Sequence, residues 1–154
     1  MAAVEARLQE LGIELPDVPS SVANYVGAVR TGELIYLSGR LPMRDGQVAF
    51  MGKLGRDVSA EDGYQAARLS TLNLVATLKA EIGDLDKVRR IVKVLGMVSS
   101  DPEFTEQASV LNGASDVLVE IFGDRGRHAR SAIGVAALPL NACVEIDLIV
   151  EVDG

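Results

Sequence analysis

The stretch from residue 126 to 152, GRHARSAIGVAALPLNACVEIDLIVEV, constrains the fold most, because two apolar runs flank a short polar turn. The pattern predicts a strand over Ser131–Leu138, a turn over Pro139–Ala142 and a second strand over Cys143–Val152. The break falls there because proline cannot donate to a strand ladder and Asn141 tolerates turn geometry. We therefore expect the two runs to pair as an antiparallel hairpin.

The second of these strands is predicted to have one apolar and one polar face. Because side chains alternate along a strand, one face carries Val144, Ile146, Leu148, Val150 and Val152, and the other carries Cys143, Glu145, Asp147, Ile149 and Glu151. The first is a core face, and the second lines a cleft or meets solvent. A four-residue loop that sets Ala137 opposite Ala142 places Arg130, Ala132 and Gly134 on the Glu145 face, and a loop one residue longer or shorter reverses this.

The remaining pattern predicts an α+β domain. Ser59 can cap a long helix, and the pair Asp101-Pro102 opens a second one. Both helices are amphipathic, so we expect them to pack on one face of a single mixed sheet. In chain order we expect a helix over Ala3–Leu11, strands over Tyr25–Arg30, Leu34–Ser38 and Gln47–Met51, a helix over Ala60–Ile82, a central strand over Ile91–Val98 and a helix over Glu103–Phe122.

Two segments resemble the motifs of a known family. ARSAIGVAALPLNACVEIDLIVEV is similar to the C-terminal signature of the Rid (reactive intermediate deaminase, or YjgF) family, in which an arginine and an apolar strand precede Leu-Pro and a Val-Glu-Ile strand. NYVGAVRTGELIYLSGRLP is similar to the N-terminal hairpin of that family, so the resemblance covers residues 19 to 152. It implies the chorismate-mutase-like (YjgF-like) fold and a homotrimer with a ligand cleft at each subunit interface.

Length and composition indicate one domain of ordinary soluble type. The chain has 154 residues, which we divide into an N-terminal helix and arm over residues 1–18 and a Rid-like domain over residues 19–154. A net charge of −7 argues against nonspecific nucleic-acid binding, which needs a basic surface. One cysteine cannot form an internal disulfide, and neither an apolar leader nor a membrane span is evident, so we expect a cytoplasmic protein without a membrane partner.

Arg130 and Glu145 are the main candidates for chemistry. A guanidinium presents a rigid fork that binds a carboxylate through two parallel hydrogen bonds, although an arginine at a strand start is otherwise a solvated charge. The resemblance implies that Arg130 holds the carboxylate of a small imino or keto acid. It also implies that Glu145 positions or activates water for imine hydrolysis, a role that needs a carboxylate with a tuned pKa. The alternative for Glu145 is an exposed strand carboxylate.

Five further residues enter the site through the resemblance. Ala132 offers its backbone to the ligand, and Tyr25, Ser38 and Gly39 line the cleft, partly from a neighbouring subunit. The chain departs from the family pattern at Arg40, where glutamine is usual, and a second arginine there would make the pocket more basic. Structural roles stay open for all of them, such as close packing in a sheet for Ala132.

The sequence favours the hydrolytic deamination of small 2-imino acids to 2-keto acids and ammonia, without a cofactor. His128 is the only histidine, so neither a metal site nor a Ser-His-acid triad can be assigned. Two alternatives stay open. One is a non-catalytic, small-metabolite-binding or chaperone-like trimer, and the other is an endoribonuclease-type activity as attributed to some relatives, which the acidic charge disfavours.

Overall fold

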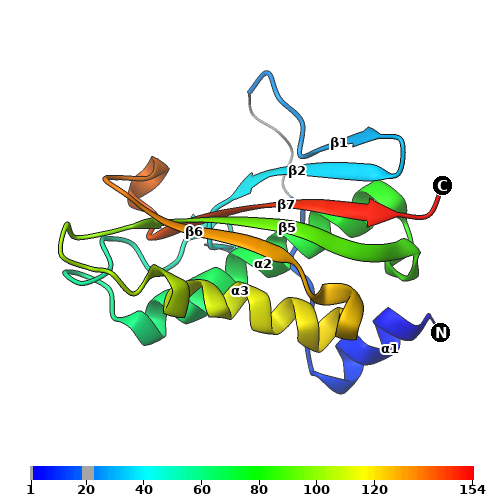
Figure 1. Ribbon diagram of the computed structural model, residues 1–154, viewed down its shortest axis with the longest axis horizontal. Coiled ribbons are helices and arrows are strands. Elements are labelled where there is room, and N and C mark those ends of the chain that lie inside the picture. The colour runs from blue at the N-terminus through cyan, green and yellow to red at the C-terminus, as the bar shows by residue number, and fades with distance from the viewer. Residues whose placement is uncertain (1, 19–22) are drawn as a thin grey trace.

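The computed structural model describes residues 2–18 and 23–154 (Figure 1). The helices and strands follow the predicted order except for the added two-residue strand Met43–Arg44, and three short 3-10 turns lie between them. In chain order they are α1 (Ala3–Glu10), β1 (Ala28–Thr31), β2 (Leu34–Arg40), β3 (Met43–Arg44), β4 (Gln47–Val48), α2 (Ala60–Ile82), η1 (Leu85–Lys87), β5 (Val88–Ser99), α3 (Gln107–Phe122), η2 (Gly123–Gly126), β6 (Ala129–Val135), η3 (Pro139–Asn141) and β7 (Val144–Val152).

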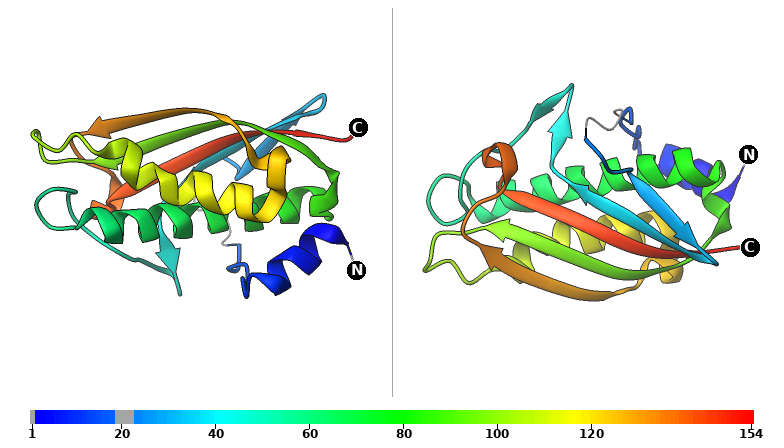
Figure 2. Two further views of the ribbon diagram at one scale, coloured as in Figure 1. Left: turned by 60° about the horizontal axis from the view of Figure 1, so that its bottom comes forward. Right: turned by 90° about the horizontal axis from the view of Figure 1, so that it is seen from above.

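Five strands form one mixed sheet in the order β1-β2-β7-β5-β6. Strands β5 and β6 are parallel, and every other neighbouring pair is antiparallel. Helices α2 and α3 lie side by side on one face of this sheet (Figure 2). The predicted α+β class, with two helices on one face of a single mixed sheet, is therefore confirmed.

The predicted hairpin between the last two strands is wrong. Strand β5 lies between β6 and β7, so these two strands do not pair with each other. Instead β6 runs parallel to β5, with α3 forming the crossover that parallel strands require. Residues 136–143 then carry the chain around the end of β5, with Leu140 and Asn141 at positive φ in η3. The sequence neighbours β6 and β7 are thus separated by a strand from earlier in the chain.

Capping explains which predicted helix boundary is right and which is wrong. Helix α2 begins and ends as predicted, because the Ser59 hydroxyl accepts a hydrogen bond from the Asp62 amide and Gly83 ends the helix at a φ of 79°. Helix α3 begins at Gln107, four residues after the predicted start. The Asp101 side chain accepts from the Glu103 amide and forms a local turn, so it does not begin the helix.

The N-terminal helix α1 is tied to the rest of the chain at its first turn. The Asp86 carboxylate accepts hydrogen bonds from the Val4 and Ala3 amides, and these bonds hold the pKa of Asp86 below its ordinary value. Val4 and Leu8 are buried in the common core. Helix α1 therefore packs against its own chain.

Gly113 allows α3 to lie close against α2. A Cβ atom at this position would overlap the main-chain carbonyl oxygen of Tyr64, which cannot move without shifting its helix. Alanine favours helix over glycine by about 1 kcal/mol, yet we expect Gly113→Ala to lower the free energy of unfolding by about 1–3 kcal/mol. Urea denaturation measures this change, with Gln65→Ala on the exposed side of α2 as the control. A midpoint that stays the same or rises would show that the helices can separate at little cost.

The sheet face opposite the helices is uncovered in the single chain (Figure 2). This face carries apolar side chains from all five strands, of which Val29, Tyr36 and Ile133 are among the exposed large hydrophobic residues of the chain. The apolar set on this face is Val29, Tyr36, Leu95, Met97, Ile133 and Ile149. An apolar face of this kind on a sheet is typical of a surface that another subunit covers.

Candidate functional site

A β-bulge brings Ser38 and Gly39 next to Glu145. Leu37 pairs with Leu148 and Arg40 with Ile146, so two residues of β2 oppose Asp147 alone. A Cβ atom on Gly39 would lie 2.6 Å from Oε2 of Glu145. Glycine is therefore the residue that leaves room for the glutamate side chain across the bulge.

The same bulge holds the segment that carries Tyr25. The Ser38 hydroxyl donates to the Val26 carbonyl at 2.6 Å, and the Ser38 amide donates to the Gly27 carbonyl at 2.9 Å. The hydroxyl proton of Ser38 is thus committed to the main chain. Tyr25, next to this tie, is 58% exposed. The structure therefore brings four predicted site residues, Tyr25, Ser38, Gly39 and Glu145, to the β2–β7 bulge.

Glu145 lies on the uncovered face of the sheet, between two fully buried residues of β7. Partial burial raises the pKa of Glu145, and the negative charge of Asp147 raises it further. Burial likewise raises the pKa of Asp147, which follows Glu145 on the same face of the strand. A carboxylate whose pKa is raised in this way binds a proton more readily, as a general base must.

Arg130 lies at the opposite edge of the sheet and faces the helices. It pairs with Val94, which is fully buried on the helix side, and its Nη1 donates to Asn112 Oδ1 at 2.9 Å and to Ser115 Oγ at 3.1 Å. Within residues 2–18 and 23–154, no carboxylate lies within ion-pair distance of this guanidinium, and neither Nε nor Nη2 has a hydrogen bond. One edge of the guanidinium is therefore available to a ligand.

The prediction that Arg130 and Glu145 share a face is wrong. Glu145 pairs with Met97 on the uncovered side, and Arg130 faces the helices two strands away. Two strand spacings amount to roughly 10 Å, and the offset along the strands adds a comparable distance. No small acid can touch both side chains of one chain. Ala132, which pairs with Gly96, lies on the Arg130 side.

Arg40 also points away from Glu145. It pairs with Ile146, a core residue, and its Nη2 lies 2.8 Å from where a Cβ of Gly27 would be. The same hypothetical Cβ would contact the methyl group of Thr77 on α2, so the end of the Arg40 side chain lies beside Gly27, just before β1, on the helix side of the sheet. Its buried Nε has no hydrogen-bond partner in the part of the chain that the structure describes. A ligand role for Arg40 stays a prediction.

Sequence reasoning missed Asn112 and Ser115. They are spaced three residues apart on α3, so both reach the same side of the helix, where they bind Arg130. Two polar residues three positions apart on a predicted helix indicate a shared polar contact on one side of that helix. The partner in this contact could not be inferred while β6 was assigned to a hairpin with β7.

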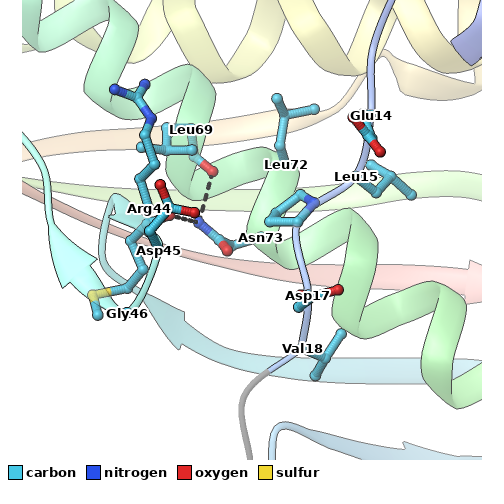
Figure 3. A pocket seen from close by; sticks show the side chains of 12 residues that line it. Glu14, Leu15, Asp17, Val18, Arg44, Asp45, Gly46, Leu69, Leu72 and Asn73 are labelled. Carbon is cyan, nitrogen blue, oxygen red and sulfur yellow. Dashed lines mark hydrogen bonds between the residues drawn. The ribbon is translucent and has the colours of Figure 1, made fainter.

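A cavity of about 660 Å³ lies elsewhere, between residues 14–18, the β3–β4 turn and α2 (Figure 3). Carboxylates of Glu14, Asp17 and Asp45 surround an apolar wall that includes Leu69 and Leu72, and Asn73 donates to the Met43 carbonyl at its edge. None of the predicted site residues lines it. Among the described residues there is also no cluster of metal-binding side chains, and no helix is long and apolar enough to cross a membrane.

Comparison with known proteins agrees with this fold. The family model described as "YjgF/chorismate_mutase-like, putative endoribonuclease" matches residues 5–152, a range that begins inside α1. Protein TCP17 of Trypanosoma cruzi is 46% identical over 151 residues, which cover 97% of this chain and 94% of that protein. The crystal structure of an Agrobacterium tumefaciens protein of unknown function is 49% identical with a TM-score of 0.90, covering 98% of this chain and 92% of the other. A Dermatophagoides farinae protein named 2-iminobutanoate/2-iminopropanoate deaminase is 29% identical over 141 residues, 92% of this chain and 95% of its own length.

Proposed function

This chain belongs to the YjgF-like (Rid) family, and on that premise we propose that it hydrolyses small 2-imino acids to 2-keto acids and ammonia. The observation that carries the proposal is the state of Arg130. The neutral side chains of Asn112 and Ser115 accept hydrogen bonds from Nη1, and the edge formed by Nε and Nη2 has no protein acceptor among the described residues. A planar fork that keeps its full charge suits the carboxylate of a small acid. A relative named as a 2-imino acid deaminase supports the substrate class.

In this proposal Glu145 acts on water. It accepts one proton as the water oxygen adds to the imine carbon, and this proton passes to the nitrogen to give a carbinolamine. The remaining hydroxyl proton is then transferred to the nitrogen as the C–N bond breaks, so that the keto C=O forms and ammonia leaves with both protons of the water. The raised pKa of Glu145 suits both steps, because the same group accepts and returns a proton. Ala132, two residues beyond Arg130, offers main-chain groups near the ligand, and Tyr25 and the Ser38-Gly39 bulge border Glu145.

The site needs more than one chain. Because Arg130 and Glu145 lie on opposite faces of one sheet, we propose that the ligand binds between the β6 edge of one subunit and the bulge of another. The uncovered apolar face supplies the surface for such an assembly, and we propose a homotrimer, as the family resemblance implies. Association would bury Val29, Tyr36 and Ile133, which otherwise stay in water.

We expect light scattering to give three times the chain mass of 16.3 kDa. Ile133→Asp places a charge on the apolar face, so it is expected to yield monomers and to abolish imine hydrolysis. Gln65→Asp, on the exposed side of α2, is the matched control and is expected to remain trimeric and active. A wild-type monomer that is fully active would contradict the proposed intersubunit site.

The activity is tested by generating imines in situ from an amino acid and following their disappearance against the spontaneous rate. Acceleration by the wild-type protein supports the proposal. Binding of 2-keto acids without any acceleration would favour a non-catalytic metabolite-binding trimer instead. Cleavage of RNA that persists through repeated purification would favour the endoribonuclease alternative.

A further inference from the structure

His128 is held by two hydrogen bonds that together define its tautomer. Its Nδ1 lies 2.6 Å from the Gly126 carbonyl oxygen, and its Nε2 lies 2.8 Å from Ser115 Oγ. A carbonyl oxygen only accepts, so Nδ1 carries the proton of the neutral imidazole. Nε2 is then an acceptor, and the Ser115 hydroxyl must donate to it.

This tautomer determines which role the Ser115 hydroxyl plays in its hydrogen bond with Arg130. With its proton directed at His128, the Ser115 oxygen presents lone pairs, and one of them accepts from Arg130 Nη1 at 3.1 Å. Asn112 Oδ1 accepts the second bond from the same nitrogen at 2.9 Å. Both protons of Nη1 are therefore used, and the Nε and Nη2 protons remain on the opposite edge.

The two groups that hold Arg130, the amide of Asn112 and the hydroxyl of Ser115, are uncharged. A carboxylate in their place would orient the guanidinium as well but would compete with a ligand carboxylate for it. Neutral acceptors fix the plane of the guanidinium and leave its charge for the ligand. The hydrogen bonds from His128 to Ser115 and from Ser115 to Arg130 therefore suit a role in orienting a binding residue.

We propose that Ser115 and His128 are positioning residues for Arg130. His128 fixes the rotation of the Ser115 hydroxyl, and Ser115 turns the Nε and Nη2 edge of Arg130 toward the carboxylate of the ligand. This inference rests on the proposed function for the identity of that ligand. The orientation of Arg130 itself can be tested without any ligand.

The first test is nuclear magnetic resonance of the 15N-labelled full-length protein. We expect the His128 nitrogens to report the Nδ1–H tautomer and the two Nη nitrogens of Arg130 to give separate signals, because the hydrogen bonds hinder rotation of the guanidinium. Ser115→Ala and His128→Asn are expected to average these signals. An Nε2–H tautomer, or averaged Nη signals in the wild type, would overturn the inference.

The second test separates the two hydrogen bonds of His128. In His128→Asn the shorter amide can still donate to the Gly126 carbonyl but does not reach Ser115. In His128→Gln the longer side chain places an oxygen near the position of Nε2, where it accepts from Ser115. We expect His128→Asn and Ser115→Ala to raise the Kd for 2-ketobutyrate and the KM for its imine by about 3- to 10-fold with little change in kcat. His128→Gln is expected to restore most of the affinity.

The outcomes distinguish a failure of the positioning role from a failure of the proposed function. If all three variants bind like the wild type, or if His128→Gln is as weak as His128→Asn, then His128 acts only on the local main chain and the inference fails. If the wild type neither binds keto acids nor hydrolyses imines while the Arg130 signals are separate as expected, the proposed function fails and the positioning role stands.

Discussion

Replacing Arg130 by alanine is expected to weaken the binding of 2-ketobutyrate by about 10- to 150-fold, because a charged bidentate contact contributes roughly 1.5–3 kcal/mol. Imine hydrolysis should fall by at least the same factor, since a substrate without its anchor does not hold the imine carbon near Glu145. Titration calorimetry measures the first loss, and imine disappearance above the spontaneous rate measures the second. The fold should be unaffected, because the side-chain hydrogen bonds of Arg130 within the described residues go to Asn112 and Ser115 alone, at the edge of α3.

Arg127→Ala provides the matched control. Arg127 is exposed and pairs with Asp124 at 3.4 Å, so its removal lowers the positive charge of the same loop without touching the proposed ligand. We expect this variant to bind 2-ketobutyrate like the wild type. Arg130→Lys keeps the charge and loses the fork, so its affinity should lie between those of wild type and Arg130→Ala. If Arg130→Ala binds and turns over like the wild type, Arg130 is a surface charge and the deaminase proposal fails.

The parts of the fold that could be predicted are those that local chemistry determines. The apolar residues of β7 that alternate from Val144 to Val152 are almost completely buried, as the period of two required. Helix α2 begins at its Ser59 cap and ends at Gly83, because both signals act within one turn of the chain. Such patterns need no knowledge of the neighbouring elements.

Strand order could not be predicted, because it depends on competition between distant segments. The Pro-Leu-Asn turn favours a direct hairpin between β6 and β7, since neighbouring strands in a sequence often pair. In the structure β5 (Val88–Ser99) pairs with both strands, with β6 on one side and with β7 on the other. Placing β5 between them changes the face on which Arg130 lies, because its register with Val94 turns it toward the helices.

Candidate site residues could be named from the motifs one at a time, but their arrangement in space could not be predicted. The motifs make Arg130 and Glu145 candidates, whereas the position of one relative to the other follows from the sheet order. The Ser115–His128 contact joins residues from α3 and from the segment before β6, and no local pattern relates them. The need for glycine at position 39 likewise becomes clear only when the Glu145 side chain is placed against it.

Glu145→Gln is expected to lower the turnover of imines by ~10²-fold or more while 2-ketobutyrate still binds, because the amide keeps the shape of the side chain and cannot accept a proton from water. The glutamine should fit against Gly39 as the glutamate does. This variant and Arg130→Ala should therefore separate, one losing rate and the other mainly affinity. Stopped-flow assays of imine loss, together with calorimetry on the same preparations, distinguish the two.

The dependence of turnover on pH provides the sharper form of the same prediction. Glu145 must be ionised to act as a base, so turnover should rise with pH through its pKa, which burial and the charge of Asp147 raise above the ordinary value. Asp147→Asn removes that like charge, lowers the pKa of Glu145 and should move the rising limb of the profile to lower pH. The limb should be missing in Glu145→Gln, whereas keto-acid binding itself should persist. If Glu145→Gln keeps both the wild-type rate and the same limb, another group activates the water and Glu145 is not the catalytic base.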